Sequence, residues 1–261
     1  MPPPLGTALI TGASAGLGVH FAEALAARGH DLILTARRLD RLETLATDLR
    51  ARHGIAVAVI AADLADPAAP GELMAEIGRR GLAVNWLINN AGFALHGPFA
   101  ELDAAAQAHM IDVNCRAPMV LARAVLPGMI QMRGGGILNV ASTAAFQPGP
   151  WMAVYYATKA FLLSVSEALH EEVRGHGVHV AAICPGPTQT EFFDAAGMGD
   201  DLLLRRLASS PERVVRDGLA ALDRNRAVRV SGLRNRVMAW SPMFGPRWLV
   251  RRVAGAIQRR R

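Results

Sequence analysis

Short apolar runs alternate with amphipathic segments along most of the chain. The apolar runs are bounded by glycine or polar residues and predict buried strands. These strands are expected at residues 5–11, 31–36, 55–62, 86–89, 136–141 and 178–184. Between them, helical spacing of apolar residues predicts helices around 21–26, 39–53, 72–80, 103–131 and 154–175. This alternation predicts an α/β fold, a doubly wound parallel sheet with helices on both faces.

The chain length of 261 residues, 51% of them hydrophobic, suits one large α/β domain with a sizeable core. We expect residues 1–223 to form this domain and residues 224–261 to be a basic extension of it, in which 227–230 is a candidate edge strand. We expect no signal peptide and no membrane-spanning helix. Cys115 and Cys184 provide no disulfide framework, and the histidines show no metal-ligand spacing. These features predict a cytoplasmic protein without a bound metal.

A glycine-rich loop, TGASAGLG at residues 11–18, separates the first strand from the first helix. Glycines in such a loop permit a tight turn and let the backbone approach a pyrophosphate, which the helix N-terminus favours through its dipole. A plain turn is the alternative, but the preceding strand and the following helix favour a dinucleotide site in a Rossmann-type fold. The candidate phosphate-binding residues are Gly12, Ser14, Ala15, Gly16, Leu17 and Gly18.

The residues that follow the second strand indicate which dinucleotide is bound. A carboxylate there would bind the ribose hydroxyl of NAD, whereas this chain has Arg37 and Arg38 after Ala36. Two arginines without a carboxylate favour the 2′-phosphate of NADP(H), with solvated helix-start arginines as the alternative. Asp63, with Leu64 beside it, follows the third strand and is placed to accept a hydrogen bond from the adenine amino group. A helix N-cap is the alternative role for Asp63.

The single lysine of the chain, Lys159, follows Tyr155 by four residues, and every other residue among the 28 Lys and Arg is arginine. On a helix the two side chains share a face. An ammonium near a phenol favours the phenolate and lowers the tyrosine pKa, so the tyrosine can exchange a proton with a substrate hydroxyl near neutral pH. Helical geometry also permits Tyr156 in this role. Two core tyrosines with a chance lysine are the structural alternative.

These motifs, in this order and near these spacings, resemble the short-chain dehydrogenase/reductase family. The other matching segments are Asn89-Asn90-Ala91-Gly92, Asn114, Ser142 and Pro185-Gly186. The resemblance covers about residues 5–195. The segments LTARR (34–38) and 154–160 look like the NADP-dependent branch that includes 3-ketoacyl reductases and related ketone reductases.

The resemblance implies roles for the catalytic residues. Tyr155 would be the general acid/base, and Lys159 would bind the nicotinamide ribose and hold the tyrosine pKa down. Ser142 would hydrogen-bond the substrate carbonyl, and Asn114 would support a water-linked proton relay. Alternatively, Ser142 is an ordinary turn serine and Thr143 is the rival hydroxyl, and Asn114 is a helix residue bonded to backbone. The resemblance also implies cofactor contacts by Asn90, Ala91, Gly92, Pro185, Gly186, Thr188 and Thr190.

We therefore expect an NADP(H)-dependent oxidoreductase that transfers hydride between the nicotinamide and a carbonyl/alcohol pair, with ketone reduction as the favoured direction. The family's substrate lid would lie at about 189–210, where apolar residues indicate a lipophilic ketone or 3-oxoacyl-type substrate, unless they only pack the lid. These residues are Phe192, Phe193, Met198 and Leu202-Leu203-Leu204, with Phe93, Phe146 and Trp151 near the presumed site. A non-catalytic NADP-binding sensor is the alternative. The family resemblance also favours a homodimer or homotetramer.

The net charge of +6 is unevenly placed. From Arg224 to Arg261 there are 11 arginines and no acidic residue, whereas the rest of the chain has 17 basic and 22 acidic residues, which does not predict nucleic-acid binding. On a helical wheel from Pro246, apolar residues fall on one side and arginines on the other. Such a segment predicts contact with an anionic membrane surface, a sister subunit or an acidic carrier, or else a solvated basic face. A protein that acts mainly through this tail is a further alternative function.

Overall fold

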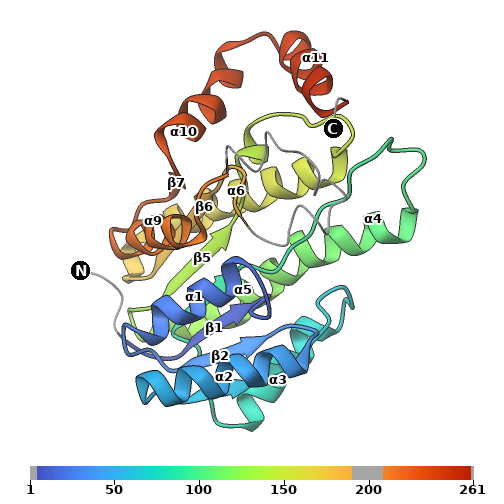
Figure 1. Cartoon of the computed structure of the whole chain (residues 1–261). Coiled ribbons are helices and arrows are strands. Elements are labelled where there is room, and N and C mark those ends of the chain that lie inside the picture. Colours follow the sequence, from blue (N-terminus) through green and yellow to red (C-terminus); the bar gives the residue numbers. More distant parts are fainter. Residues whose placement is uncertain (1–4, 190–207, 260–261) are drawn as a thin grey trace.

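The computed structural model describes residues 5–189 and 208–259. They form a seven-stranded parallel sheet in the order β3-β2-β1-β4-β5-β6-β7, covered by helices (Figure 1). The predicted α/β, doubly wound Rossmann-type fold is confirmed. The strands are β1 (Ala8–Thr11), β2 (Leu32–Thr35), β3 (Val57–Val59), β4 (Trp86–Asn89), β5 (Gly136–Val140), β6 (His179–Cys184) and β7 (Val228–Val230).

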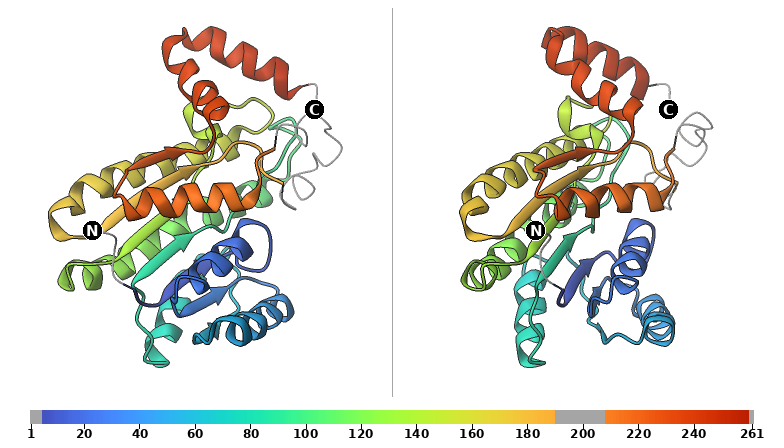
Figure 2. Two further views of the ribbon diagram at one scale, coloured as in Figure 1. Left: turned by 60° about the vertical axis from the view of Figure 1, so that its left-hand side comes forward. Right: turned by 90° about the vertical axis from the view of Figure 1, so that its left-hand side faces the viewer.

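Helices cover both faces of the sheet (Figure 2). Because side chains alternate along a strand, Ile10 and Leu34 face one layer while Leu9 and Ile33 face the other. The first layer contains α1 (Leu17–Ala26), α2 (Leu39–His53) and α9 (Pro211–Asp223). The second contains α3 (Ala69–Arg79), α5 (Ala117–Gln131) and α6 (Ala153–Val173). This double burial explains why the strands appear in the sequence as continuous apolar runs.

Several elements differ from the sequence prediction. The strand expected at 55–62 is only three residues long, and the single helix expected at 103–131 is interrupted. It begins as α4 (Ala104–Ile111), widens into a π-helical turn at Asp112–Arg116 and continues as α5. Helix α9 was not predicted, although Ser210 caps it by accepting a hydrogen bond from the Arg213 amide and Pro211 occupies its first turn.

The C-terminal segment continues the fold beyond the sheet. The candidate edge strand at 227–230 is β7, which pairs with β6 in register Ile183 to Arg229. After it come α10 (Leu233–Trp240), a 3₁₀ turn (Ser241–Phe244) and α11 (Arg247–Gln258). In Figures 1 and 2 these elements lie at one extremity of the molecule, far from α2 and α3. Helix α11 matches the helix expected from Pro246, whereas α10 was not predicted.

Candidate active site

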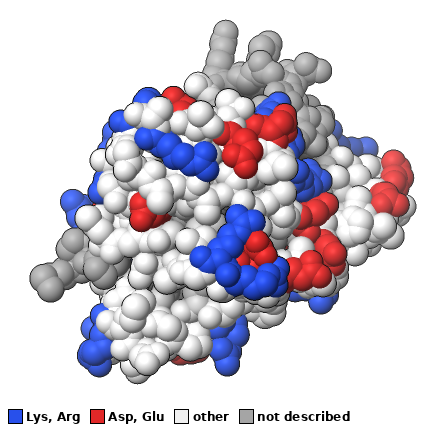
Figure 3. All heavy atoms as spheres, turned by 90° about the horizontal axis from the view of Figure 1, so that it is seen from below, with Lys and Arg blue, Asp and Glu red and all other residues white. Residues whose placement is uncertain are grey.

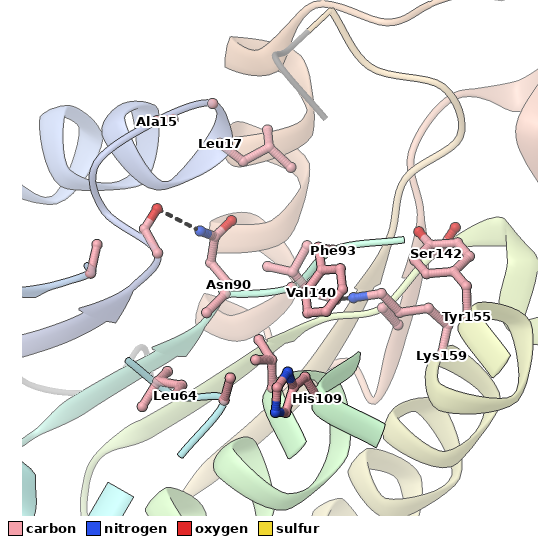
Figure 4. Close-up of a pocket in the computed structure, with 18 of the residues that line it drawn as sticks. Ala15, Leu17, Leu64, Asn90, Phe93, His109, Val140, Ser142, Tyr155 and Lys159 are labelled. Carbon is pink, nitrogen blue, oxygen red and sulfur yellow. Dashed lines mark hydrogen bonds between the residues drawn. The ribbon is translucent and has the colours of Figure 1, made fainter. Parts of the chain in front are cut away.

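A cavity of about 920 Å³ opens where the carboxyl ends of the parallel strands meet. The strand order reverses between β1 and β4, and open α/β sheets bind ligands at this switch point. Figure 4 shows Ala15 and Leu17 at one end, Asn90 between, and Tyr155 and Lys159 at the other end. The predicted site residues that line the cavity are Gly12, Ser14, Ala15, Gly16, Leu17, Arg37, Arg38, Asp63, Leu64, Asn90, Ala91, Gly92, Ser142, Tyr155, Lys159, Pro185, Gly186 and Thr188.

The glycine-rich loop approaches the sheet too closely for larger residues. Gly12 has φ +66°, and a Cβ there would lie 2.9 Å from the Ala91 Cα. Gly18 does not line the cavity; its missing Cβ would collide with the Gly12 carbonyl, so this glycine lets α1 pack against the loop. Helix α1 begins at Leu17, and its N-cap residue, Gly16, provides no side-chain cap. Its first amides therefore lack a side-chain acceptor and are suited to an anion.

Strand ends β1 and β4 are joined by a small hydrogen-bond network. The Thr11 hydroxyl accepts from the amides of Asn90 and Ala91 at 3.0 and 2.9 Å. The Asn90 side chain in turn donates to the Thr11 carbonyl at 2.8 Å. Asn90 thus has a structural role in holding the loop, besides lining the cavity.

Two exposed arginines lie at the loop end of the cavity. Arg38 donates from Nε to the Ser14 hydroxyl at 3.3 Å and from a terminal nitrogen to the Ser14 carbonyl at 3.4 Å, while Arg37 lines the same end. Asp63 accepts a hydrogen bond from the Ala65 amide at 3.1 Å, a local turn contact. It is not the N-cap weighed as its alternative role, because helix α3 begins only at Ala69, after Ala68. The cavity therefore combines two positive charges with the helix N-terminus at this end.

Helix α6 and the end of β5 bring three polar side chains together at the other end. Tyr155 and Lys159 are one helical turn apart, with exposed fractions of only 8% and 4%. The Lys159 ammonium lies 5.9 Å from the centre of the Tyr155 ring and donates to the Val140 carbonyl at 2.8 Å. Ser142 follows β5 and hydrogen-bonds to Tyr155. Thr143, the rival hydroxyl, also lines the cavity.

The acid–base balance of this group differs from the sequence expectation. Burial raises the pKa of Tyr155 to about 12, outweighing the opposing effect of the Ser142 hydrogen bond. Burial also lowers the pKa of Lys159 to about 8. The expected lowering of the tyrosine pKa by the lysine is therefore absent here, because desolvation of both side chains dominates. In this structure Tyr155 is a protonated phenol at neutral pH.

Tyr156 differs from its neighbour in its surroundings. Its ring packs against Gly149, where a Cβ would collide with it. Its hydroxyl is 2.7 Å from the Nε2 of Gln258, in α11. The two adjacent tyrosines therefore face different partners: Tyr155 meets Ser142 and Lys159, and Tyr156 meets the C-terminal helix.

Asn114 does not line the cavity but lies in the π-helical turn behind it. Its side chain accepts from the Phe93 amide at 3.1 Å and donates to the Phe93 carbonyl and the Thr158 hydroxyl, both at 3.0 Å. A Cβ at Gly92 would be 3.0 Å from the Asn114 Oδ1 and 3.4 Å from the Lys159 Nζ. Asn114 thus holds the backbone beside Lys159, which matches the alternative role weighed for it.

Other expectations about the cavity wall are partly wrong. Phe93 lines the cavity, but Phe146 and Trp151 do not, because Phe146 packs beside β6 and Trp151 lies against Gly255 of α11. Thr190 and the apolar residues of the expected lid lie outside the described residues. In the described part of the chain, no group of three or more His, Cys, Asp or Glu could hold a metal ion.

The structure also adds residues that sequence reasoning missed. His109, Val113 and Met152 line the cavity, and so does Gln258 from the far end of the chain. His109 and Val113 lie one helical turn apart across the α4 junction, a spacing too common to single them out. No sequence pattern marked Gln258 as a site residue, because the tail was treated as an appendage of the domain. Two of these four, Val113 and Met152, are apolar, and Met152 packs in one cluster with Tyr155.

Comparison with known proteins gives consistent results. The family model of the short chain dehydrogenases matches residues 6–199. A very-long-chain 3-oxoacyl-CoA reductase of Phaeosphaeria nodorum is 40% identical over 185 residues, which are 69% of this chain and 54% of that protein. An NADP-dependent 3-hydroxy acid dehydrogenase of Salmonella typhi is 37% identical over 195 residues, 74% of this chain and 77% of that protein.

A solved structure resembles almost the whole chain. The short-chain dehydrogenase from Sphingobium yanoikuyae in complex with NADPH has a TM-score of 0.83 and 37% sequence identity, with 94% of each chain covered. By contrast, the alignment spans only about half the length of the 3-oxoacyl-CoA reductase. The resemblance to the solved structure therefore includes the C-terminal part that the family model leaves out.

Proposed function

The chain belongs to the short-chain dehydrogenase/reductase family of oxidoreductases, and we propose that it is an NADP(H)-dependent ketone reductase. The reaction would transfer hydride between the nicotinamide and a carbonyl/alcohol pair. One observation carries the proposal: a single cavity has Ser142, Tyr155 and Lys159 at one end and two arginines beside a helix N-terminus at the other. A dinucleotide has its phosphates and its reactive ring at opposite ends, which suits this arrangement.

The residues present fit the cofactor. Gly12 and Gly18 allow the tight packing of the loop against the sheet and α1, and the start of α1, which has no side-chain cap, suits a pyrophosphate. Arg37 and Arg38 would bind the 2′-phosphate, because guanidinium groups suit phosphate oxygens. When bound, NADPH would supply the hydride. Lys159 would hold the nicotinamide ribose. The rest of the dinucleotide would contact Asn90, Ala91, Gly92, Pro185, Gly186 and Thr188.

The chain's own residues would handle the proton and the substrate oxygen. Because burial holds the pKa of Tyr155 at about 12, its Oη keeps a proton at neutral pH and can donate it to the oxygen of a ketone. Ser142 would donate a hydrogen bond to the same oxygen and orient it. Lys159, whose pKa burial lowers to about 8, can give up a proton near neutral pH and so replenish Tyr155. The protonated tyrosine favours the reductive direction.

The cavity wall supports a lipophilic substrate. Phe93 and Met152 line it and pack in one cluster with Tyr155, and Val113 lines it as well. Among the described residues, Asp63 and Asp66 are the only acidic side chains that line it. Those two carboxylates follow β3, at the adenine end of the proposed dinucleotide site. The relatives named as a 3-oxoacyl-CoA reductase and a 3-hydroxy acid dehydrogenase support an oxo or hydroxy acyl substrate. We propose a lipophilic ketone or a 3-oxoacyl thioester.

Titration of the purified protein with NADPH and with NADH tests the cofactor assignment. We expect tighter binding of NADPH, and we expect Arg37→Ala and Arg38→Ala to weaken NADPH binding while NADH binding changes little. Arg123→Ala, at an exposed arginine outside the cavity, is the matched control. Equal affinities for the two nucleotides in the unaltered protein would contradict the assignment.

A further inference from the structure

Helices α10 and α11 present their apolar sides outward. In α11 the buried residues are Ala254, Gly255 and Gln258, whereas Leu249, Val253 and Ile257 are 43–50% exposed. In α10 the buried residues are likewise small or polar, namely Asn235 and Ala239. A helix that packs on a globular core normally buries its large apolar residues. Both tail helices do the reverse.

The exposed apolar residues concentrate in this segment. Of the 17 large apolar side chains that are exposed in the described residues, ten lie within 25 positions of the tail. The most exposed, Phe244, has an exposed fraction of 86%. Apolar side chains clustered in this way mark contact surfaces rather than ordinary protein surface. We call these ten the outer apolar face: Leu233, Val237, Met238, Trp240, Met243, Phe244, Trp248, Leu249, Val253 and Ile257.

The charged side chains that the tail itself contributes are all positive. Arginines flank it in both helices, at Arg234 and Arg236 in α10 and at Arg251 and Arg252 in α11, where Arg252 stacks over Trp248 at 5.7 Å. No acidic residue occurs from Arg224 to the end of the chain. The face seen in Figure 3, from the side away from the tail in Figure 1, carries basic and acidic residues together.

We propose that the outer apolar face lies on the surface of an anionic lipid bilayer. Apolar and aromatic residues flanked by arginines suit the boundary between acyl chains and anionic head groups. A second copy of the chain suits this face less well. A two-fold interface brings the same patch of both subunits together, and here it would crowd the arginines of both tails with no carboxylate in either. The contact is peripheral, since no described helix is long and apolar enough to span a membrane.

The inner side of the same helix belongs to the active-site cavity. Gln258 lines the cavity and meets the Tyr156 hydroxyl, and a Cβ at Gly255 would lie 3.4 Å from Pro150 and 3.5 Å from Trp151. Helix α11 therefore has its outer side available for lipid and its inner side against the segment that leads into Tyr155. This position gives a lipophilic substrate, if the proposed function holds, a short path from the bilayer.

Co-sedimentation of the full-length protein with vesicles tests the proposal without any assay of activity. We expect binding to vesicles of phosphatidylcholine with phosphatidylglycerol, little binding to phosphatidylcholine alone, and release as salt shortens the range of the arginine charges. Arg251→Gln with Arg252→Gln should weaken binding by roughly fivefold per arginine. Arg123→Gln with Arg216→Gln, two exposed arginines outside the tail, is the matched control and should bind like the unaltered protein.

A second pair of variants tests the apolar contribution. Trp248→Ser with Leu249→Ser should lower vesicle binding at least tenfold, whereas Phe99→Ser with Met132→Ser, at exposed apolar positions elsewhere, should not. Nucleotide titration and circular dichroism of each variant establish that it is folded. Equal binding to neutral and anionic vesicles, or to neither, would overturn the proposal. So would tail variants that dissociate an oligomer in light scattering and leave vesicle binding unchanged, because the face would then be a subunit interface.

Discussion

Helices α9 and α11 are both amphipathic and both belong to the C-terminal part of the chain, yet they orient their apolar sides in opposite ways. Helix α9 buries Val214, Leu219 and Leu222 against the sheet. Helix α11 buries Ala254, Gly255 and Gln258 and leaves Leu249 and Val253 exposed. Periodicity alone therefore predicts a helix but not the side on which it packs. The difference separates the body, in which helices such as α9 bury apolar side chains against the sheet, from the tail (α10 to α11), which exposes them.

The two adjacent tyrosines offer the strongest test of this separation. Tyr155 belongs to the body and meets Ser142, while Tyr156 meets Gln258 of the tail. We expect Tyr155→Phe to lower kcat by about 10²–10⁴-fold, because it removes the proposed proton donor. Tyr156→Phe removes the contact of the hydroxyl to Gln258 of α11 and should lower kcat by less than about tenfold. Steady-state reduction of a lipophilic ketone with NADPH, with folding checked by nucleotide binding, measures both.

The opposite ranking of the tyrosines would contradict the assignment of the acid. A near-normal rate for Tyr155→Phe would mean that another group supplies the proton. The nearest candidate is Tyr156, which lies three residues before Lys159 and also lines the cavity. A loss of rate in both variants without loss of nucleotide binding would instead mean that the docked tail is part of the catalytic geometry.

Two leucines allow the same comparison for stability. Leu219 of α9 is 1% exposed, whereas Leu249 of α11 is 43% exposed. Leu219→Ala leaves a cavity in the core and should lower the free energy of unfolding by about 2–5 kcal/mol. Leu249→Ala removes a side chain that water already reaches and should cost about 0.5 kcal/mol or less. Urea unfolding in the absence of lipid compares them. Similar losses would show that the outer apolar face is buried within an assembly of the protein.

The sequence predicted the body much better than the tail, and the reason is physical. Strand β4 was predicted with its true bounds, because a strand that is buried on both faces appears in the sequence as a continuous apolar run. Ser142 and Tyr155 were found through ordered motifs, and the structure brings them together. Gln258 could not be found, since its place in the cavity wall depends on how α11 packs against Pro150 and Trp151.

The pKa values were the least predictable feature of the site. The pairing of Lys159 with Tyr155 suggested a lowered tyrosine pKa, but the sequence does not state how far either group is removed from water. Burial of both reverses the expectation for the tyrosine, because desolvation penalises the charged form of each side chain. Proximity was predictable here, and the dielectric surroundings were not.

The smallest expected effect is a pH dependence of the free energy of unfolding that comes from the buried lysine of the body. Burial lowers the pKa of Lys159 to about 8, below its usual 10.5. Below pH 8 the folded and unfolded chains both hold this proton, so the cost of burying the charge is constant. Above pH 8 the folded protein loses the proton while the unfolded chain retains it. Stability should then rise with pH, because the unfolded state binds more protons.

Urea unfolding at pH 8 and pH 9, compared with the same measurement on Lys159→Met, isolates this contribution. The unaltered protein should gain on the order of 1 kcal/mol relative to the variant over this interval. Burial raises the pKa of Cys115 to about 11 and that of Cys184 to about 12. Near pH 9 these thiols begin to ionise in the unfolded chain only, which opposes the gain in stability. Both proteins contain the two cysteines, so the comparison with the variant removes this effect. Parallel pH dependences would mean that Lys159 keeps its charge when folded, and it would then stand in the site as a fixed cation beside Tyr155 rather than as a source of protons.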